Sequence, residues 1–299
     1  MTAAALMADP QYDKVTNSWL CALPDGLKAP SSMAPFVPDA EAAQLPVLPD
    51  GTSRLDLLEE SIPGDDGVGG RVWVGAGAMC RFIRSNADLV RGASVLELGA
   101  GTGASGLYAA CAGASRVALT DGGPPPVIDL LRRNVDKHAH LFTKGTRATA
   151  AHYRFGEMPL PSAPAESDAA GTGSSGGGFD VIIGSDITYS VRYDRDALAR
   201  TLHGLLSRGG GSQGAPRVVL AHEHRRSTMF DVATLVENRP AARWDENDYA
   251  LGIFLETASE HGLRVTPRLT TPGRRGRSNH DETVVHMTTD LSILEVELA

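Results

Sequence analysis

The sequence predicts an α/β fold, built on a doubly wound, mostly parallel seven-stranded sheet with an antiparallel closing strand. Short apolar runs typical of buried strands alternate with longer runs typical of helices. A glycine-rich segment directly follows the first core strand run. The last two apolar runs follow one another without a helical run between them, so one of these two strands is expected to be antiparallel.

The elements before the core are less regular. Residues 1–50 carry seven prolines and no helical or strand periodicity, which predicts a loosely ordered N-terminal arm ahead of a single domain at 51–299. "RLDLLEES", residues 54–61, is predicted to be an early strand that the turn-rich "IPGDDGVGG" ends. Residues 73–89 are predicted to be a helix, because apolar residues recur there at helical spacing.

The core then follows in order. Strands are predicted at 93–98, 115–121, 147–153, 178–186, 216–223, 263–271 and 291–298. Helices are predicted at 102–114, 124–138, 194–208 and 244–262, the second with prolines in its first turn, where missing N–H groups cost least. The Gly/Ser-rich segment 161–178 is predicted to be a flexible surface loop, since doubling the length of a loop costs only about 0.6 kcal/mol.

Composition narrows the functional class. The chain is 42% hydrophobic and 21% charged, which is typical of a globular protein, and its net charge of -8 argues against a general nucleic-acid binder. No apolar run approaches the roughly 20 residues that cross a bilayer, and the start lacks a secretory pattern. Three cysteines form no metal-type pair and cannot all be bridged. We therefore expect a monomeric cytoplasmic protein, with a nuclear location left open, that contacts neither nucleic acid nor membrane.

The glycine-rich segment "VLELGAGTGASG", residues 95–106, is the main candidate for a ligand site. In this architecture ligands bind beyond the carboxyl ends of the strands. Gly101, Gly103 and Gly106 match the G-x-G-x-x-G spacing of dinucleotide-binding proteins, and Asp121 lies at the offset of their ribose-binding acid. An NAD(P)-dependent oxidoreductase is therefore one interpretation.

Glu97 favours a different ligand. It lies two residues before Gly99, at the tip of the strand, where a carboxylate would oppose a pyrophosphate. Like charges about 4 Å apart cost roughly 4 kcal/mol at an effective dielectric constant of 20. S-adenosylmethionine carries an ammonium and a sulfonium instead of phosphates, so an acid at Glu97 suits it, while Asp121 can bind its ribose hydroxyls.

Three motifs also resemble those of a known family. "VLELGAGTGASGL", "VALTD" and "GSDITY" are similar to the successive motifs of class I, seven-strand methyltransferases. "GGRVWVGAGAMCRFI", "HYRFG" and the Asp-x-x-Tyr of residues 186–189 resemble, more narrowly, family-16 protein-lysine methyltransferases. The resemblance runs from about residue 52 to the C-terminus. It implies a Rossmann-like fold, S-adenosyl-L-methionine as cofactor and methyl transfer to a lysine of a protein substrate.

The resemblance also implies roles for individual residues. The methionine part of the cofactor would lie near the loop after the first core strand, its ribose near the acid of the second, and its adenosine near two aromatic residues and a serine. The amine of the substrate would enter beside the Asp-x-x-Tyr pair. The methionine part corresponds to Gly99, Ala100 and Gly101, and the ribose to Asp121. The adenosine corresponds to Trp73, Phe155 and Ser185, and the substrate amine to Asp186 and Tyr189.

The sequence departs from the family pattern in three places. Phe155 replaces the usual tryptophan, which keeps an aromatic face but loses the indole N–H donor. "VWVGAG" lacks the proline common after the Val-Trp pair, and the 161–178 insertion is not typical.

We expect Asp186 to orient the substrate amine and Tyr189 to fix it through its hydroxyl and ring. Neither is assigned as a strong base, because a carboxylate close to the amine would stabilise its charged form. In the alternative, Asp186 only caps the next helix. "HEHRR", residues 222–226, places two histidines at a strand end with no third ligand evident, so no metal is expected. A small-molecule N-methyltransferase and a catalytically silent binding module remain alternatives.

Overall fold

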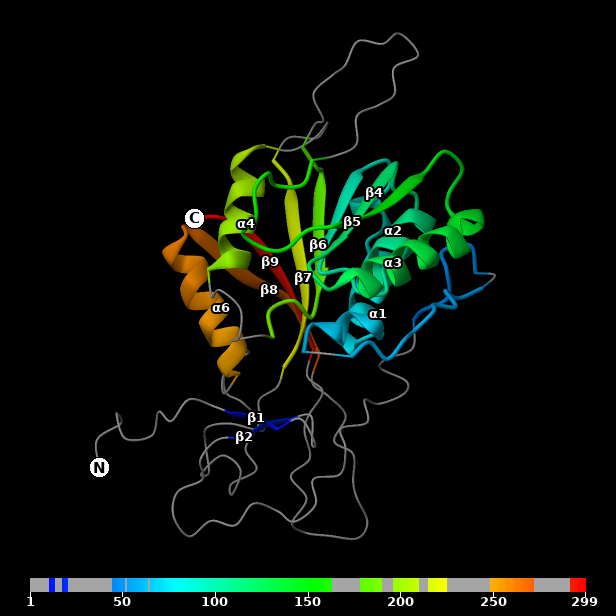
Figure 1. Ribbon diagram of the computed structural model, residues 1–299. Coiled ribbons are helices and arrows are strands. Elements are labelled where there is room, and N and C mark those ends of the chain that lie inside the picture. Colours follow the sequence, from blue (N-terminus) through cyan, green and yellow to red (C-terminus); the bar gives the residue numbers. More distant parts are fainter. Residues whose placement is uncertain are drawn as a thin grey trace, which may run out of the picture.

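The computed structural model describes residues 11–13, 18–20, 45–51, 53–63, 65–162, 178–189, 196–209, 215–224, 248–271 and 291–299. Its main sheet has seven strands in the order β5-β4-β3-β6-β7-β9-β8 (Figure 1). In chain order these are β3 (Ser94–Leu98), β4 (Arg116–Asp121), β5 (Arg147–His152), β6 (Val181–Ser185), β7 (Arg217–Glu223), β8 (Leu263–Thr271) and β9 (Leu291–Leu298).

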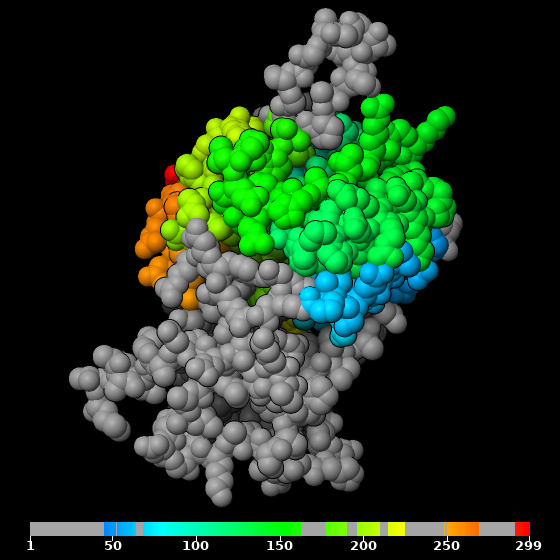
Figure 2. All heavy atoms as spheres, in the orientation of Figure 1, coloured from blue at the N-terminus to red at the C-terminus, as the bar shows by residue number. Residues whose placement is uncertain are grey.

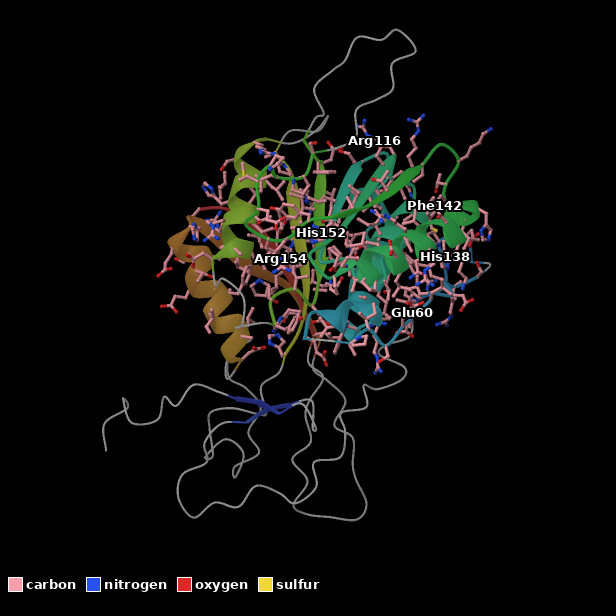
Figure 3. All side chains as sticks on the ribbon, in the orientation of Figure 1. Glu60, Arg116, His138, Phe142, His152 and Arg154 are labelled. Carbon is pink, nitrogen blue, oxygen red and sulfur yellow. The ribbon has the colours of Figure 1, made fainter. Side chains whose placement is uncertain are left out.

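The sheet confirms the predicted fold class. Strands β3 to β7 pair in parallel, whereas β9 pairs antiparallel with both β7 and β8. The order reverses at β3, whose neighbours β4 and β6 lie on its two sides. In Figure 3, Arg116 marks the N-terminal end of β4 and His152 the C-terminal end of β5. A ligand crevice is therefore expected at the C-terminal ends of β3 and β6.

Helices cover both faces of the sheet. One face packs against α1 (Val74–Ser85), α2 (Ala104–Cys111) and α3 (Pro125–His138), and the other against α4 (Ala197–Ser207) and α6 (Tyr249–Glu260). Short 3-10 helices lie at η2 (Asp65–Gly70), η3 (Ala87–Leu89) and η4 (Ala139–Leu141). Within the described ranges, no helix combines the length and apolar character needed to cross a membrane.

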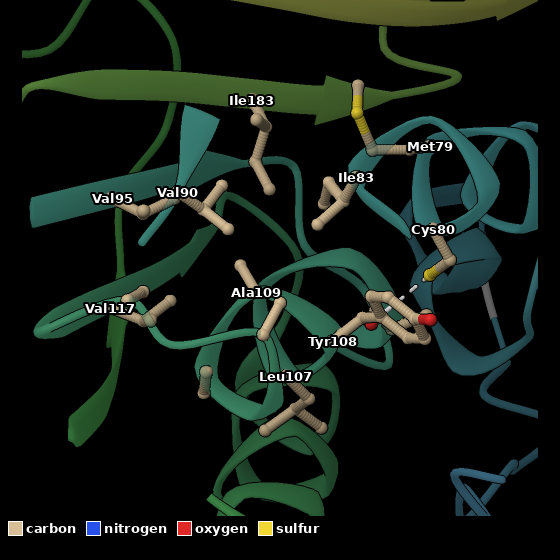
Figure 4. Packing of buried hydrophobic residues seen from close by; sticks show 14 of the residues in the cluster. Met79, Cys80, Ile83, Val90, Val95, Leu107, Tyr108, Ala109, Val117 and Ile183 are labelled. Atoms are coloured by element: carbon tan, nitrogen blue, oxygen red, sulfur yellow. Dashed lines mark hydrogen bonds between the residues drawn. The ribbon is translucent and has the colours of Figure 1, made fainter. Parts of the chain in front are cut away.

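The strands divide their side chains between the two faces because successive residues point to opposite sides. Val95, Val117 and Ile183 enter the core beneath α1 and α2, where Figure 4 shows them with Val90 and Ala109. The residues beside them in sequence enter the opposite core, against α4 and α6: Leu96, Ala118 and Ile182. Strands buried on both faces read as continuous apolar runs, which is why the sequence located them.

The predicted strand at 54–61 is wrong. Residues 53–63 form no regular element, although they pack along α3 (Figure 2). The backbone of Leu58 exchanges two hydrogen bonds with the side chain of Asn134, and the N–H of Glu60 donates to the carbonyl of Gly70. These partners satisfy the backbone groups that a neighbouring strand would otherwise have bonded.

The last residues of the predicted N-terminal arm pack against the domain. Leu45 and Leu48 are buried in the core beneath α1 and α2, and the Tyr108 hydroxyl donates to the carbonyl of Val47 over 2.8 Å. Of the predicted arm, the structure also describes β1 (Gln11–Asp13) and β2 (Ser18–Leu20), which pair antiparallel. Residues 163–177 of the Gly/Ser segment lie outside the described residues.

Replacing Asn134 by alanine should reduce the free energy of unfolding by about 1–3 kcal/mol. The Asn134 side chain accepts from the N–H of Leu58 and donates to the carbonyls of Leu58 and Thr102. An alanine would leave these three backbone groups without that hydrogen-bond partner. Urea unfolding measures the loss. Arg132→Ala, which removes an exposed ion pair with Asp129, serves as the control and should cost at most about 1 kcal/mol. Equal losses in the two variants would contradict the bridging role of Asn134.

Candidate functional site

The loop between β3 and α2 requires its glycines. Gly99, Gly101 and Gly103 all adopt left-handed backbone conformations, with φ of 62°, 52° and 86°. A side chain on Gly99 would begin 2.5 Å from the Cγ2 atom of Ile187 and 3.5 Å from the Cζ atom of Phe155. The loop therefore lies directly against the segment after β6 and against the aromatic residue after β5.

The 3-10 helix η2 lies against the same loop. A Cβ atom on Gly101 would lie 3.0 Å from the carbonyl oxygen of Gly69, and one on Gly69 would lie 3.3 Å from the Cα atom of Gly101. Gly69 of η2 thus contributes to the site, although the sequence analysis treated this turn-rich segment only as the end of a strand. The sequence feature that could have predicted this contact is a second cluster of glycines, because glycine permits such a close approach of two backbones.

Asp121 faces the glycine loop from the end of β4. Its Oδ2 atom accepts from the N–H of Gly101 and its Oδ1 atom from the N–H of Gly123, both over 2.7 Å. Burial raises the pKa of Asp121, and the two backbone hydrogen bonds oppose that rise. Each carboxylate oxygen keeps a second lone pair, so this residue can accept hydrogen bonds from a ligand hydroxyl while it holds the loop.

Glu97 does not point out of the strand tip. It is buried, and its Oε2 atom accepts from the N–H of Gly106 in the first turn of α2 over 2.9 Å. Burial raises the pKa of Glu97 to about 8, even though hydrogen bonds to Gly106 and Ser105 lower it. The carboxyl group is therefore mostly protonated at neutral pH, and its charge alone does not exclude a phosphate.

Trp73 and Ser185 lie at the edges of this arrangement. Trp73 immediately precedes α1 and is half-buried, and its indole N–H donates to the carbonyl of Val68 over 3.0 Å. Ser185 ends β6, and its hydroxyl lies 2.8 Å from that of Ser105 in α2. Ser105, which the sequence analysis did not single out, thus ties the glycine-loop helix to β6.

Asp186 joins three elements. Its Oδ2 atom accepts from the N–H of Gly75 in α1 over 2.9 Å, its Oδ1 atom accepts from the N–H of Glu223 over 2.8 Å, and its own N–H donates to the carbonyl of Ala221. It is buried and adopts a left-handed backbone with φ of 53°, which is unusual for a residue other than glycine. Asp186 therefore caps a helix as the alternative had it, but the helix is α1.

The rest of the Asp-x-x-Tyr segment follows directly. Tyr189 is half-buried. The buried hydroxyl of Thr188 lies 2.6 Å from the Nδ1 atom of His222, at the end of β7. Sequence reasoning missed Thr188 and His222 as partners, because they lie 34 positions apart and no sequence pattern pairs them. All ten predicted site residues thus lie on the glycine loop, before α1 or at the C-terminal ends of β3 to β6. The acceptor oxygens of Asp121 beside the glycine loop suit a ligand that carries hydroxyl groups, such as a nucleoside.

Comparison with known proteins gives consistent matches. A family model described as lysine methyltransferase matches residues 52–235, more than half of the chain. The calmodulin-lysine N-methyltransferase of Arabidopsis thaliana is 32% identical over 59% of this chain and 55% of its own. The protein N-terminal and lysine N-methyltransferase efm7 of Emericella nidulans is 30% identical over 47% of this chain and 53% of its own. The protein N-lysine methyltransferase METTL21A of Danio rerio is 34% identical over 47% of this chain and 57% of its own. The chain thus spans about half the length of these curated relatives.

Glu97→Gln should change how stability depends on pH. In the wild type the pKa of Glu97 is about 8 when folded and near 4.5 when unfolded, so the folded state binds more protons between these values. Its free energy of unfolding should therefore fall, by up to about 5 kcal/mol, as the pH rises through this window. Glutamine does not ionise, and the variant should lack this contribution.

Urea unfolding across this pH range tests the expectation as the difference between variant and wild type. Exposed Glu256→Gln is the matched control and should follow the wild type. Parallel pH profiles for wild type and Glu97→Gln would show that Glu97 ionises normally in the folded protein.

Proposed function

This chain belongs to the lysine methyltransferase family. We therefore propose that it transfers a methyl group from S-adenosyl-L-methionine to a lysine side chain of a protein substrate. The observation that carries the proposal is the position of Asp121, which accepts from the glycine loop at the reversal of strand order. The names of the relatives, which act on calmodulin or on other protein lysines, support a protein substrate.

The residues of the loop fit the proposed cofactor. Left-handed Gly99 and Gly101 let the loop turn tightly against Ile187 and η2, and Asp121 offers acceptors for ribose hydroxyls. Trp73 and Phe155 supply aromatic faces for the adenosine, and Ser185 lies on the wall between α2 and β6. When bound, S-adenosyl-L-methionine supplies a methyl group attached to a positively charged sulfur.

The chain's own task is to deliver a neutral amine in the correct orientation. With a reference pKa of about 10.4, a lysine amine costs roughly 4.6 kcal/mol to deprotonate at pH 7, and a nearby free carboxylate would increase that cost. Both carboxylate oxygens of Asp186 accept backbone N–H groups, which reduces its pull on the amine proton. We assign Asp186 to hold the segment in place, and Tyr189 to contact the amine.

The rival interpretations have less support. The spacing of Gly101, Gly103 and Gly106 that suggested a dinucleotide serves two structural needs: Gly103 turns the chain, and Gly106 leaves room for the Glu97 carboxyl. A small-molecule N-methyltransferase would share the cofactor residues. We propose the cytoplasm as the location and a monomer as the active form. The acidic net charge favours a protein partner over nucleic acid.

Transfer to protein lysine can be tested in a lysate depleted of methylation. The full chain is incubated there with isotope-labelled methyl donor, and labelled residues are mapped by mass spectrometry. We expect label on lysine in a dominant protein, and its loss with Tyr189→Phe. Label confined to small molecules would favour the rival methyltransferase, and tight binding of NADH without binding of S-adenosylhomocysteine would overturn the proposal.

Asp121→Asn should weaken binding of S-adenosylhomocysteine about 10- to 100-fold, because a charged acceptor for hydroxyl groups is worth roughly 1.5–3 kcal/mol. Isothermal titration calorimetry measures the dissociation constant. Asp129→Asn removes an exposed acid of α3 and should bind as the wild type does. Unchanged affinity in Asp121→Asn would remove Asp121 from the cofactor site.

A further inference from the structure

Two histidines and an aspartate converge at the end of β7. His222 and His224 point to the same side because they are two residues apart at the end of a strand, and Asp248 precedes α6. The Oδ2 atom of Asp248 lies 2.7 Å from the Nε2 atom of His222 and 3.1 Å from the Nδ1 atom of His224. All three side chains are buried, and their nearest ligand atoms lie within 4.8 Å of one another.

We propose that His222, His224 and Asp248 form a zinc site, in which the Nε2 atom of His222, the Nδ1 atom of His224 and the Oδ2 atom of Asp248 are the protein ligands. The sequence analysis expected no metal because it found no third ligand beside the two histidines. The fold supplies that ligand as Asp248, the residue that precedes α6.

Two of the three ligand distances are close to those around a zinc ion, and the third must shorten. The two histidine nitrogens lie within 4.8 Å of one another, whereas two ligands of one zinc ion lie at most about 4.2 Å apart. Zinc binds imidazole nitrogen and carboxylate oxygen at about 2.0–2.1 Å, so two ligands at a tetrahedral angle lie roughly 3.3 Å apart. The 3.1 Å between His224 and Asp248 is close to this value, and the 2.7 Å to His222 requires an opening of about half an ångström. A water molecule would complete the four ligands, as in other zinc sites with three protein ligands.

The surroundings of both histidines suit a metal-bound state. The outward nitrogen of His222 faces the hydroxyl of Thr188 over 2.6 Å, and that of His224 faces the hydroxyl of Ser292 over 2.7 Å. A hydroxyl can accept as well as donate, so each can take the N–H of an imidazole whose inward nitrogen binds the ion. Such outer partners fix the ring orientation and the tautomer of metal-binding histidines.

The carboxyl group is also in the form that binds metal. The reference pKa of an aspartate side chain, about 3.9, makes the carboxylate the ordinary form at neutral pH. Two imidazoles and one carboxylate suit zinc more than magnesium or calcium, which prefer oxygen ligands throughout. The proposed ion would join β7, α6 and, through Thr188, the segment that carries Tyr189. This proposal does not depend on methyl transfer.

The test is the metal content of the full chain. The protein is produced in zinc-supplemented medium, freed of any affinity tag and purified by gel filtration. Its metal content is then measured by inductively coupled plasma mass spectrometry. We expect about one zinc per chain. Asp248→Asn, which keeps an oxygen to cap α6 through the N–H of Leu251, and His224→Gln should both lose the ion. Exposed His203→Ala in α4 should retain it, which controls for surface histidines.

A variant with an intermediate effect on zinc affinity distinguishes a zinc site from a cluster held only by hydrogen bonds. Ser292→Ala removes only an outer partner and should weaken zinc affinity about 10- to 100-fold in competition with a chromogenic chelator. Circular dichroism confirms that each variant folds. The proposal is overturned if the folded wild type contains no zinc, if Asp248→Asn holds as much zinc as the wild type, or if another metal occupies the site in place of zinc.

Discussion

The candidate site depends on the buried carboxylate of Asp186. This one group accepts backbone N–H groups from α1 and from the end of β7, while its own N–H continues the pairing of β6 with β7. Gly75 makes the contact possible, since a Cβ atom there would lie 2.5 Å from the carboxylate. The left-handed backbone of Asp186 costs of order 1–3 kcal/mol, which these hydrogen bonds offset. The hydrogen bond to Gly75 fixes the start of α1, which Trp73 directly precedes.

The two other acids of the site differ in environment. Asp121 is held by two backbone N–H groups at the rim of the glycine loop, where its oxygens remain available to a ligand. Glu97 is buried beneath the first turn of α2, and burial raises its pKa to about 8. A cationic ligand nearby would favour its ionised form, whereas a phosphate would favour the protonated one. The preference for a cation that the sequence suggested therefore requires proton loss from Glu97.

The end of β7 serves two sites through its alternating residues. The backbone N–H of Glu223 holds Asp186, while the side chains of His222 and His224 on either side converge on Asp248. The link between His222 and Thr188 then connects the proposed zinc site to the proposed substrate segment. An ion there would further restrain that segment, in which Ile187 already packs on Gly99.

Local signals in the sequence, periodicity and glycine spacing, predicted the order of the core strands and helices, the antiparallel closing pair, and the glycine loop with Asp121 at the end of the next strand. Other features appear only in the folded chain: residues 54–61 are not a strand, Glu97 is buried, Asp186 caps α1, and Asp248 meets His222 and His224. In each case the deciding partner lies at least nine residues away in sequence, as with Asn134 for Leu58. Such contacts form when packing brings distant segments together, and leave no periodic pattern in the chain.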